Sequence, residues 1–286
     1  MKKIVITAES GSDITAEDRE RYGIEIIPMH VTMGDVSLDD GAFPPEDVCR
    51  YYDENKVLPK TSGCSPDDFT RFFERVNEKY PGAHIFHMAY SAETTVSYNS
   101  ALIASEDRED ITVIDTKHVS VGQRAAVLAA ARLLEENPDM EIEELKQAAE
   151  KLCERTRMCF VPADLVYLHA GGRCSNLVFV GGQLLKLHPC IEVLDGKLVA
   201  GKKYRGSFRK IIPSLVKSYG EKYNLDKSHI WFIWSPGLSD EMKAIADEAA
   251  RECGYKEITW VKTGCVITTH GGPGAFGVVG MSAEEK

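Results

Sequence analysis

The chain has 286 residues, of which 43% are hydrophobic and 27% are charged, and its formal net charge is −10. This length and composition predict one large or two ordinary globular domains. The acidic balance argues against nucleic acid as a partner, because phosphate binding needs clustered lysines and arginines. No apolar run is long enough to span a bilayer, so we expect no stable membrane insertion.

The N-terminal segment and the cysteines predict a cytoplasmic protein without a metal site. Residues 1–7 lead directly into a strand pattern and lack the apolar stretch and cleavage site of a signal peptide. The eight cysteines are scattered, and none forms a C-x-x-C pair. We therefore expect reduced thiols that are mostly buried.

Strand and helix patterns alternate in the first half of the chain. Strands are predicted over residues 4–7, 24–27, 85–89 and 111–115, and helices over residues 65–80, 91–105, 119–136 and 142–155. The helix at 65–80 has a clear start, because Ser65 suits the N-cap and Pro66 suits the first helical position. The alternation predicts an α/β fold with a mostly parallel sheet flanked by helices.

The pattern changes near residue 160, so we divide the chain into an N-terminal α/β domain, 1–160, and a C-terminal mixed α/β domain, 161–286. A hairpin is expected over residues 190–200, turning at Asp195-Gly196. It is followed by predicted helices at 207–219 and 240–253 and predicted strands at 230–234 and 258–261.

The segment 268–277, Thr-Thr-His-Gly-Gly-Pro-Gly-Ala-Phe-Gly, is the most informative part of the sequence. A histidine followed by glycines can hold an anion between the imidazole of His270 and backbone N–H groups, such as that of Gly271. A purely structural glycine-rich turn is the alternative. The formal G-x-G-x-x-G match at 272–277 is not a dinucleotide fingerprint, because the chain ends before the helix, strand and acidic residue that the fingerprint requires.

Two groups of hydroxyl residues are further candidates for binding an anion. Thr61 and Ser62 precede the helix capped by Ser65, and a helix N-terminus favours an anion; alternatively, they only shape the loop. Ser91 follows a predicted strand, where ligands of open α/β sheets lie, although it could simply cap the next helix.

Two charged groups also stand out. Residues 202–205, Lys-Lys-Tyr-Arg, are followed by Arg209 and Lys210, and could meet a phosphate, a carboxylate or an acidic partner; a solvated surface is the alternative. Glu9 and Asp13 flank a short segment after the first strand. For them we favour helix capping over binding of a polar ligand.

In this order and spacing, the motifs resemble those of the DegV family over nearly the whole chain. The residues that carry the resemblance are 9–13, Lys60-Thr61-Ser62, Ser91, 98–101, Asp115-Thr116, Gly122, Asp164-Leu165, Tyr167-Leu168, Gly171-Gly172-Arg173, 182–185, Pro189, Asp195-Gly196, Arg205 and His270-Gly-Gly-Pro-Gly.

The resemblance implies a two-domain protein that buries a long-chain fatty acid between or beneath its domains. It implies no further cofactor and no catalysis by the protein itself; the carboxylate is presented to a separate fatty-acid kinase, which forms the acyl phosphate. By resemblance, the lipid contacts are Thr61, Ser62, Ser91, Thr95, His270 and Gly271. Arg205 and His270 match positions implicated in kinase docking or phosphoryl transfer.

The sequence departs from the family pattern at several positions. Ala92 replaces a possible carboxylate donor, Val96 replaces a glycine, and His188 replaces a lysine. We hypothesise that Thr94 or Thr95 adds polarity near the pocket. We also expect the Ala/Val/Leu-rich stretch at 125–134 to form a wall of the lipid tunnel.

Two other classes of function stay open at this point. One is an acyl- or phosphoryl-transfer enzyme that uses His270, Ser91 and Glu9, which requires the nucleophile and the base to lie within hydrogen-bonding distance. The other is a regulatory interaction module in which a bound lipid is incidental.

Overall fold

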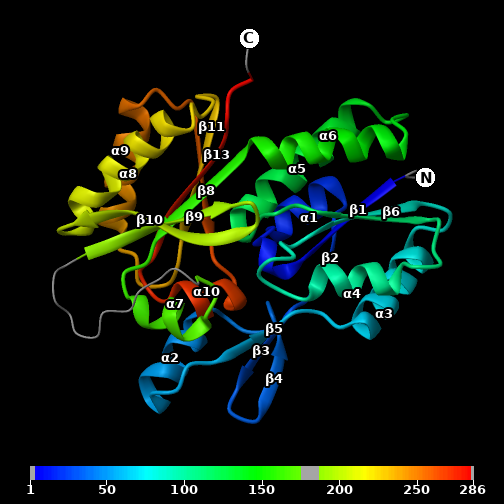
Figure 1. Cartoon of the computed structure of the whole chain (residues 1–286), viewed down its shortest axis with the longest axis horizontal. Helices are drawn as coiled ribbons and strands as arrows, with labels where there is room; N and C mark the ends of the chain where they lie inside the picture. The colour runs from blue at the N-terminus through cyan, green and yellow to red at the C-terminus, as the bar shows by residue number, and fades with distance from the viewer. Residues whose placement is uncertain (1–3, 175–186, 285–286) are drawn as a thin grey trace.

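A four-stranded parallel sheet forms the centre of the first half of the molecule (Figure 1). The computed structural model describes residues 4–174 and 187–284. The sheet has the strand order β2-β1-β6-β7, and its strands are β1 (Ile4–Glu9), β2 (Glu25–Ile27), β6 (His84–Ala89) and β7 (Ile111–Asp115). All three pairings are parallel.

Helices bury both faces of this parallel sheet, as the alternating sequence pattern predicts. Their bounds are α1 (Ala16–Tyr22), α3 (Pro66–Lys79), α4 (Ser97–Ala104), α5 (Ser120–Glu136) and α6 (Ile142–Arg155). Phe69, Phe72 and Phe73 of α3 pack against one face, and the apolar residues of α5 and α6 pack against the other. Ser65 caps α3 in a reciprocal capping box with Asp68, which confirms the predicted helix start.

The second half is built on a six-stranded mixed sheet with the order β10-β9-β8-β13-β11-β12. Its strands are β8 (Thr156–Val161), β9 (Leu187–Leu194), β10 (Lys197–Arg205), β11 (His229–Trp234), β12 (Glu257–Lys262) and β13 (Phe276–Met281). Helices α8 (Phe208–Lys222) and α9 (Asp240–Glu252) pack on one face. On the other face, Val121 and Ala125 of α5 belong to the same buried cluster as Met158 and Val279, and α5 contacts β8 and β13, so α5 joins the two halves.

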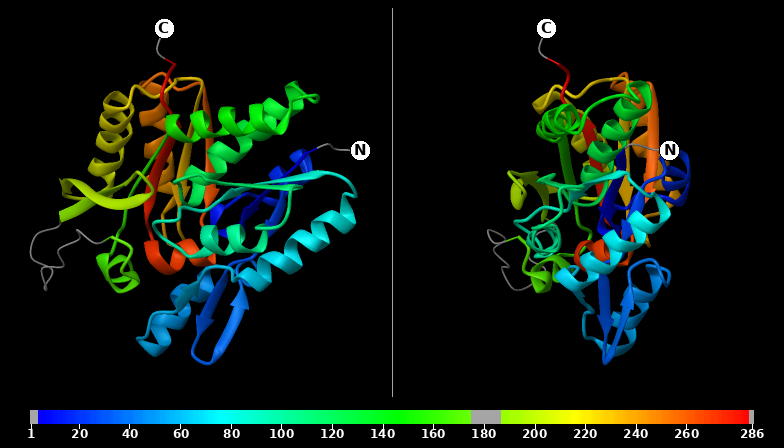
Figure 2. Two further views of the ribbon diagram at one scale, coloured as in Figure 1. Left: turned by 45° about the vertical axis from the view of Figure 1, so that its right-hand side comes forward. Right: turned by 90° about the vertical axis from the view of Figure 1, so that its right-hand side faces the viewer.

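A third, antiparallel sheet of order β4-β3-β5 projects from one end of the molecule (Figure 2). It consists of β3 (His30–Met33), β4 (Val36–Asp39) and β5 (Lys60–Ser62), and α2 (Glu46–Asn55) lies beside it. Two short helices from the second half, α7 (Leu165–Gly171) and α10 (Cys265–Gly271), lie between this sheet and the six-stranded sheet. Helix α10 contacts α2, α7, β3 and β5.

The predicted α/β class, with its parallel first sheet and mixed second half, is confirmed, while several local predictions need correction. The boundary placed at residue 160 falls inside β8, which belongs to the second sheet. The helix expected from residue 91 begins at Ser97, because residues 91–96 form turns in which Thr94 bonds back to the Ser91 carbonyl. Thr61 and Ser62 lie in a short strand rather than a loop.

The described part of the chain contains no helix that is both long and apolar enough to cross a membrane. It also contains no group of three or more metal-ligating side chains.

Candidate functional site

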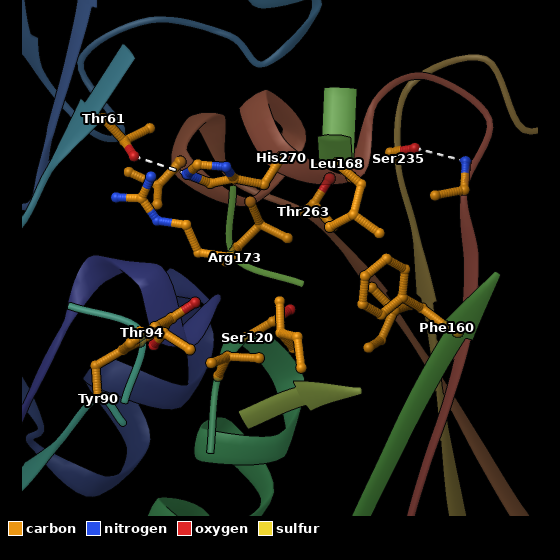
Figure 3. Close-up of a pocket in the computed structure, with 18 of the residues that line it drawn as sticks. Thr61, Tyr90, Thr94, Ser120, Phe160, Leu168, Arg173, Ser235, Thr263 and His270 are labelled. Carbon is orange, nitrogen blue, oxygen red and sulfur yellow. Dashed lines mark hydrogen bonds between the residues drawn. The ribbon is translucent and has the colours of Figure 1, made fainter. Parts of the chain in front are cut away.

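A cavity whose empty space, including the part open to solvent, is about 830 Å³ lies where the two halves and the small sheet meet (Figure 3). Its wall is formed by residues of β5, β8, β10, β11, β13, α7 and α10, and by the segments that follow β6 and β7. Most of the wall is apolar, with Met158, Phe160, Leu168, Ile233 and Phe276 as its large side chains. The cavity therefore offers an apolar ligand a mostly apolar surface.

A cluster of polar groups marks one part of this cavity. Thr61 Oγ1 and His270 Nε2 are hydrogen-bonded at 2.7 Å, and they come from opposite halves of the chain. The Arg173 guanidinium lies beside this pair in Figure 3, and one of its nitrogens donates to the Gly171 carbonyl at 2.5 Å. Ser62, Thr94, Thr95 and Gly271 also line the cavity. This cluster places one positive charge and several donors where an anionic group of a ligand could bind.

The glycine run positions His270 in a way that the sequence did not reveal. His270 lies in the last turn of α10, and Gly272 ends the helix with a φ of +71°. A Cβ at Gly272 would lie 2.7 Å from the Tyr167 ring, so a larger residue would both strain the turn and clash with α7. A Cβ at Gly171 would similarly lie 2.3 Å from His270 Nδ1. The glycines thus allow α7 and α10 to pack closely around the imidazole.

His270 is neutral near pH 7. Burial, together with the positive charge of Arg173, lowers its pKa to about 4. Its Nδ1 atom is buried and has no hydrogen-bond partner among the described residues. The imidazole can therefore donate or accept a single hydrogen bond at the polar end of the cavity, but it supplies no permanent charge. That charge comes from Arg173.

Two other hydroxyl groups along the wall, those of Ser235 and Thr263, already have partners within the protein. Ser235 donates to the Gly272 carbonyl at 2.6 Å and accepts from the Ala275 N–H at 2.8 Å. The hydroxyls of Thr263 and Thr268 bond to each other at 2.8 Å. Because these groups are satisfied, they add little polarity to the interior of the cavity.

Most of the predicted lipid contacts lie around this cavity, but not all of them do. Thr61, Ser62, Thr95, His270 and Gly271 line it, as does Thr94. Ser91 does not: its side chain is buried behind the wall, and its hydroxyl donates to the Gly196 carbonyl at 2.8 Å. Residues 125–134 do not line it either, since α5 contributes only Ser120, after Val119. The motif at 182–185 lies outside the described residues.

Two charged groups lie away from the polar cluster. Arg205 is exposed at the end of β10 and does not line the cavity. Glu9 is fully buried, and its carboxylate accepts hydrogen bonds from the Tyr90 N–H at 2.8 Å and from Gln123 at 2.9 Å. It caps no helix through its side chain, so the capping interpretation of Glu9 was wrong.

Comparison with known proteins agrees with this architecture. The family model described as an uncharacterised protein of the DegV family matches residues 3–283. The chain belongs to the DegV family. A "Fatty acid-binding protein" of Thermotoga maritima is 29% identical to it over 294 residues, covering 96% of each chain.

Solved structures of DegV proteins share the fold over nearly the whole chain. One, described as "Fatty Acid Binding of a DegV family Protein from Thermus thermophilus", has a TM-score of 0.87 and 26% identity, covering 98% of this chain and all of the other. A stearic acid-binding protein from Eubacterium ventriosum has a TM-score of 0.83 and 25% identity, covering 99% and 98%.

Arg173 lies in the polar cluster of the cavity, but the sequence analysis did not single it out. It was noted only as part of the Gly171-Gly172-Arg173 motif. An arginine after two glycines in an acidic chain could have indicated a binding site for an anion. Its proximity to Thr61 and His270, however, depends on how α7 packs on α10.

The low pKa of His270 can be tested by NMR titration of its imidazole. We expect a midpoint near pH 4, well below the ordinary value of about 6.5. Because the folded-state pKa is lowered, this group destabilises the fold as pH falls from 6.5 toward 4. Arg173→Met should raise the midpoint, whereas Arg209→Met, which changes an exposed arginine on α8, should not. A midpoint near 6.5 in the unmodified protein would contradict the assignment.

Proposed function

We propose that this DegV protein binds a long-chain fatty acid, with the carboxylate at the Thr61–His270–Arg173 cluster and the acyl chain along the apolar wall. The observation that carries the proposal is the cavity itself, which combines a large apolar lining with a group of donors that includes a cation. An amphipathic ligand with one anionic end matches this distribution. The names of the fatty-acid-binding relatives support the same ligand class.

The two parts of the site would contribute differently to binding. Each methylene of the acyl chain that leaves water contributes about 0.8 kcal/mol, so the tail supplies most of the affinity. The carboxylate fixes the orientation, because an unpaired charge in the apolar part would be costly. We assign its contacts to Thr61, Ser62, Thr95, His270 and the Gly271 N–H, with Arg173 supplying the opposite charge.

We further propose that the bound acid is presented to a fatty-acid kinase. Lys202, Lys203 and Arg205 are exposed along β10, and Arg209 follows on α8. A local basic surface in a chain of net charge −10 suits an acidic surface on a partner protein or a phosphate-bearing site. Arg205 and His270 are the residues that we assign to this step.

A hydrolytic or transfer enzyme based on Ser91, His270 and Glu9 is less well supported. Ser91 bonds to the Gly196 carbonyl, and Glu9 bonds to Tyr90 and Gln123. His270 bonds to Thr61. In residues 4–174 and 187–284 no hydrogen bond joins these three side chains to one another, so they do not form a nucleophile–base arrangement.

Variants of the polar cluster test the proposed position of the carboxylate. Hydrogen bonds to charged groups contribute about 1.5–3 kcal/mol, so Thr61→Val and Arg173→Met should each weaken fatty-acid binding by roughly 10- to 100-fold. Binding is measured by displacement of a fluorescent fatty acid. Thr112→Val, which removes a hydroxyl that bonds to His84 far from the cavity, serves as the matched control.

A neutral ligand separates loss of the head-group contact from general damage to the cavity. The matching long-chain alcohol should bind the unmodified protein and the two variants with similar affinity. Equal loss of acid and alcohol binding would contradict a specific carboxylate contact.

The partner step is tested with purified fatty-acid kinase and ATP. We expect Arg205→Ala to retain the fatty acid but to lower acyl-phosphate formation by at least tenfold, because Arg205 lies outside the cavity. Arg251→Ala, an exposed change on α9, should leave both properties unchanged. If Arg205→Ala supported acyl-phosphate formation at the rate of the unmodified protein, the assignment of Arg205 to the partner surface would be contradicted.

A further inference from the structure

Two buried carboxylates hold the first turn of α10. Asp13 Oδ1 accepts the Gly264 N–H at 2.7 Å, and Asp40 Oδ1 accepts the N–H groups of Cys265 at 2.9 Å and Val266 at 3.4 Å. Each aspartate is only 8% exposed. Both belong to the first half of the chain, whereas α10 belongs to the second. The start of the helix that carries His270 is thus attached to the opposite half.

The Asp13 contact is also linked to the wall of the lipid cavity. Asp13 Oδ2 accepts a 2.5 Å hydrogen bond from Ser120, a residue that lines the cavity. Asp13 and Ser120 have φ values of +55° and +48°, in the left-handed region that non-glycine residues seldom adopt. Such strain persists only where the surrounding structure enforces it, and it often accompanies a functional constraint.

The two carboxylates lie close enough to repel each other when both are ionised. If Gly264 carried a Cβ, that atom would lie 3.2 Å from Asp13 Oδ1 and 3.2 Å from Asp40 Oδ1. The distance between the two Oδ1 atoms is therefore at most twice this value. Asp40 Oδ2 is held by Ser10 at 2.8 Å. Arg124 is the described cation that acts on Asp13, but its own hydrogen bonds go to Asp18 at 2.8 and 3.0 Å.

The remaining titratable neighbours do not offset this repulsion. Glu9 and Tyr90 lie on the side of the parallel sheet, and the Cys265 thiol lies on α10. Burial, together with the charges of Asp13, Glu9 and Asp40, raises the pKa of Tyr90. Burial and the charge of Asp40 raise the pKa of the Cys265 thiol to about 12. Both groups are therefore neutral near pH 7 and add no positive charge beside the two aspartates; among the described residues, the cations whose charges reach this region are Arg124, which acts on Asp13, and Arg173, which acts on Tyr90.

We propose that Asp13 and Asp40 form a proton-controlled clamp on the first turn of α10, which tightens when Asp13 is protonated and loosens when both aspartates are charged. A protonated Asp13 still accepts the Gly264 N–H through its carbonyl oxygen. Ionisation adds a second buried negative charge beside Asp40 and favours separation of α10 from the first half. If the cavity holds a fatty acid as proposed above, loosening speeds its exchange, because α10 and Ser120 both form the wall.

The pH range follows from the titration of Asp13. Burial raises its pKa to about 7, and the charge of Asp40 acts in the same direction; burial also raises the pKa of Asp40. In the open state, Asp13 has an ordinary pKa of about 3.9. Between these two pKa values the clamped state binds more protons than the open state, so the clamp weakens as pH rises. Above pH 7, Asp13 is ionised in both states, and the clamp weakens no further.

Hydrogen–deuterium exchange of the lipid-free protein tests the clamp directly. After correction for intrinsic exchange rates, the protection factors of the amides in α10 should fall about tenfold between pH 6 and pH 8, as expected for a group that titrates at about 7 in the closed state. Protection of α9 should not change. Asp13→Asn, which keeps the acceptor but cannot ionise, should abolish the fall.

Two further variants make this experiment specific. Asp40→Asn removes the neighbouring charge and should shift the transition to lower pH. Asp115→Asn is the matched control, because Asp115 is a half-buried carboxyl that also has a raised pKa, and it bonds to the N–H groups of Lys117 and Ala92 rather than to α10. Constant protection of α10 across this range, or the same fall in Asp13→Asn, would overturn the proposal.

Ligand release tests the consequence for the cavity. A long-chain alcohol is used, because its head group does not titrate in this range. It should leave the unmodified protein several-fold faster at pH 8 than at pH 6, and at equal rates in Asp13→Asn. Equal rates in the unmodified protein would overturn the link to the cavity. Failure of every lipid to bind would instead contradict the proposed function, while the exchange result still decides the clamp.

Discussion

Helix α10 is held at both ends by residues of the other half of the chain, and the cavity depends on this arrangement. Asp13 and Asp40 accept the N–H groups at its start, and Thr61 bonds to His270 at its end. These contacts join residues that are 251, 225 and 209 positions apart in the sequence. Neither half of the molecule encloses the cavity alone, so the cavity exists only when both halves have folded and packed.

The distribution of polar groups around the cavity follows from the same packing. Along the apolar wall, the Ser235 hydroxyl bonds to a backbone carbonyl and a backbone N–H, and the Thr263 hydroxyl bonds to that of Thr268. At the junction of β5, α7 and α10, by contrast, a positive charge lies beside a neutral imidazole and a threonine. Under the proposed function, the difference between these two regions would favour one orientation of an amphipathic ligand, since an acid group would lose hydration in the apolar part without gaining partners.

Part of this structure could be predicted from the sequence, because local patterns carry it. The alternation of apolar strands with amphipathic helices gave the parallel sheet, and Ser65 with Pro66 gave the start of α3. The short strand at Lys60–Ser62 escaped prediction, because its pairing with β3 is a long-range interaction and three polar residues show no periodicity. Helix α10 escaped because it is short and ends in glycines, which indicate a turn when read alone.

For similar reasons, the sequence indicated only some of the residues that line the cavity. Residues such as Thr61 and His270, which line the cavity, could be singled out because they lie in recognisable sequence motifs. Side-chain direction is not encoded locally, so Ser91 was expected to face the ligand although its hydroxyl turns to the Gly196 carbonyl on the β9–β10 hairpin. The positions of Arg173 beside His270 and of Asp13 and Asp40 at the start of α10 depend on contacts between distant segments, which the sequence does not reveal.

The most direct test of the account is to ask what the protein carries when it is purified under native conditions. The protein is extracted with organic solvent, and the fatty acids in the extract are identified and quantified by mass spectrometry. The account predicts a stoichiometric amount of long-chain fatty acid, which the purified protein takes up again after delipidation. An extract without fatty acid, from a folded protein that also takes up none when it is added, would contradict the central claim.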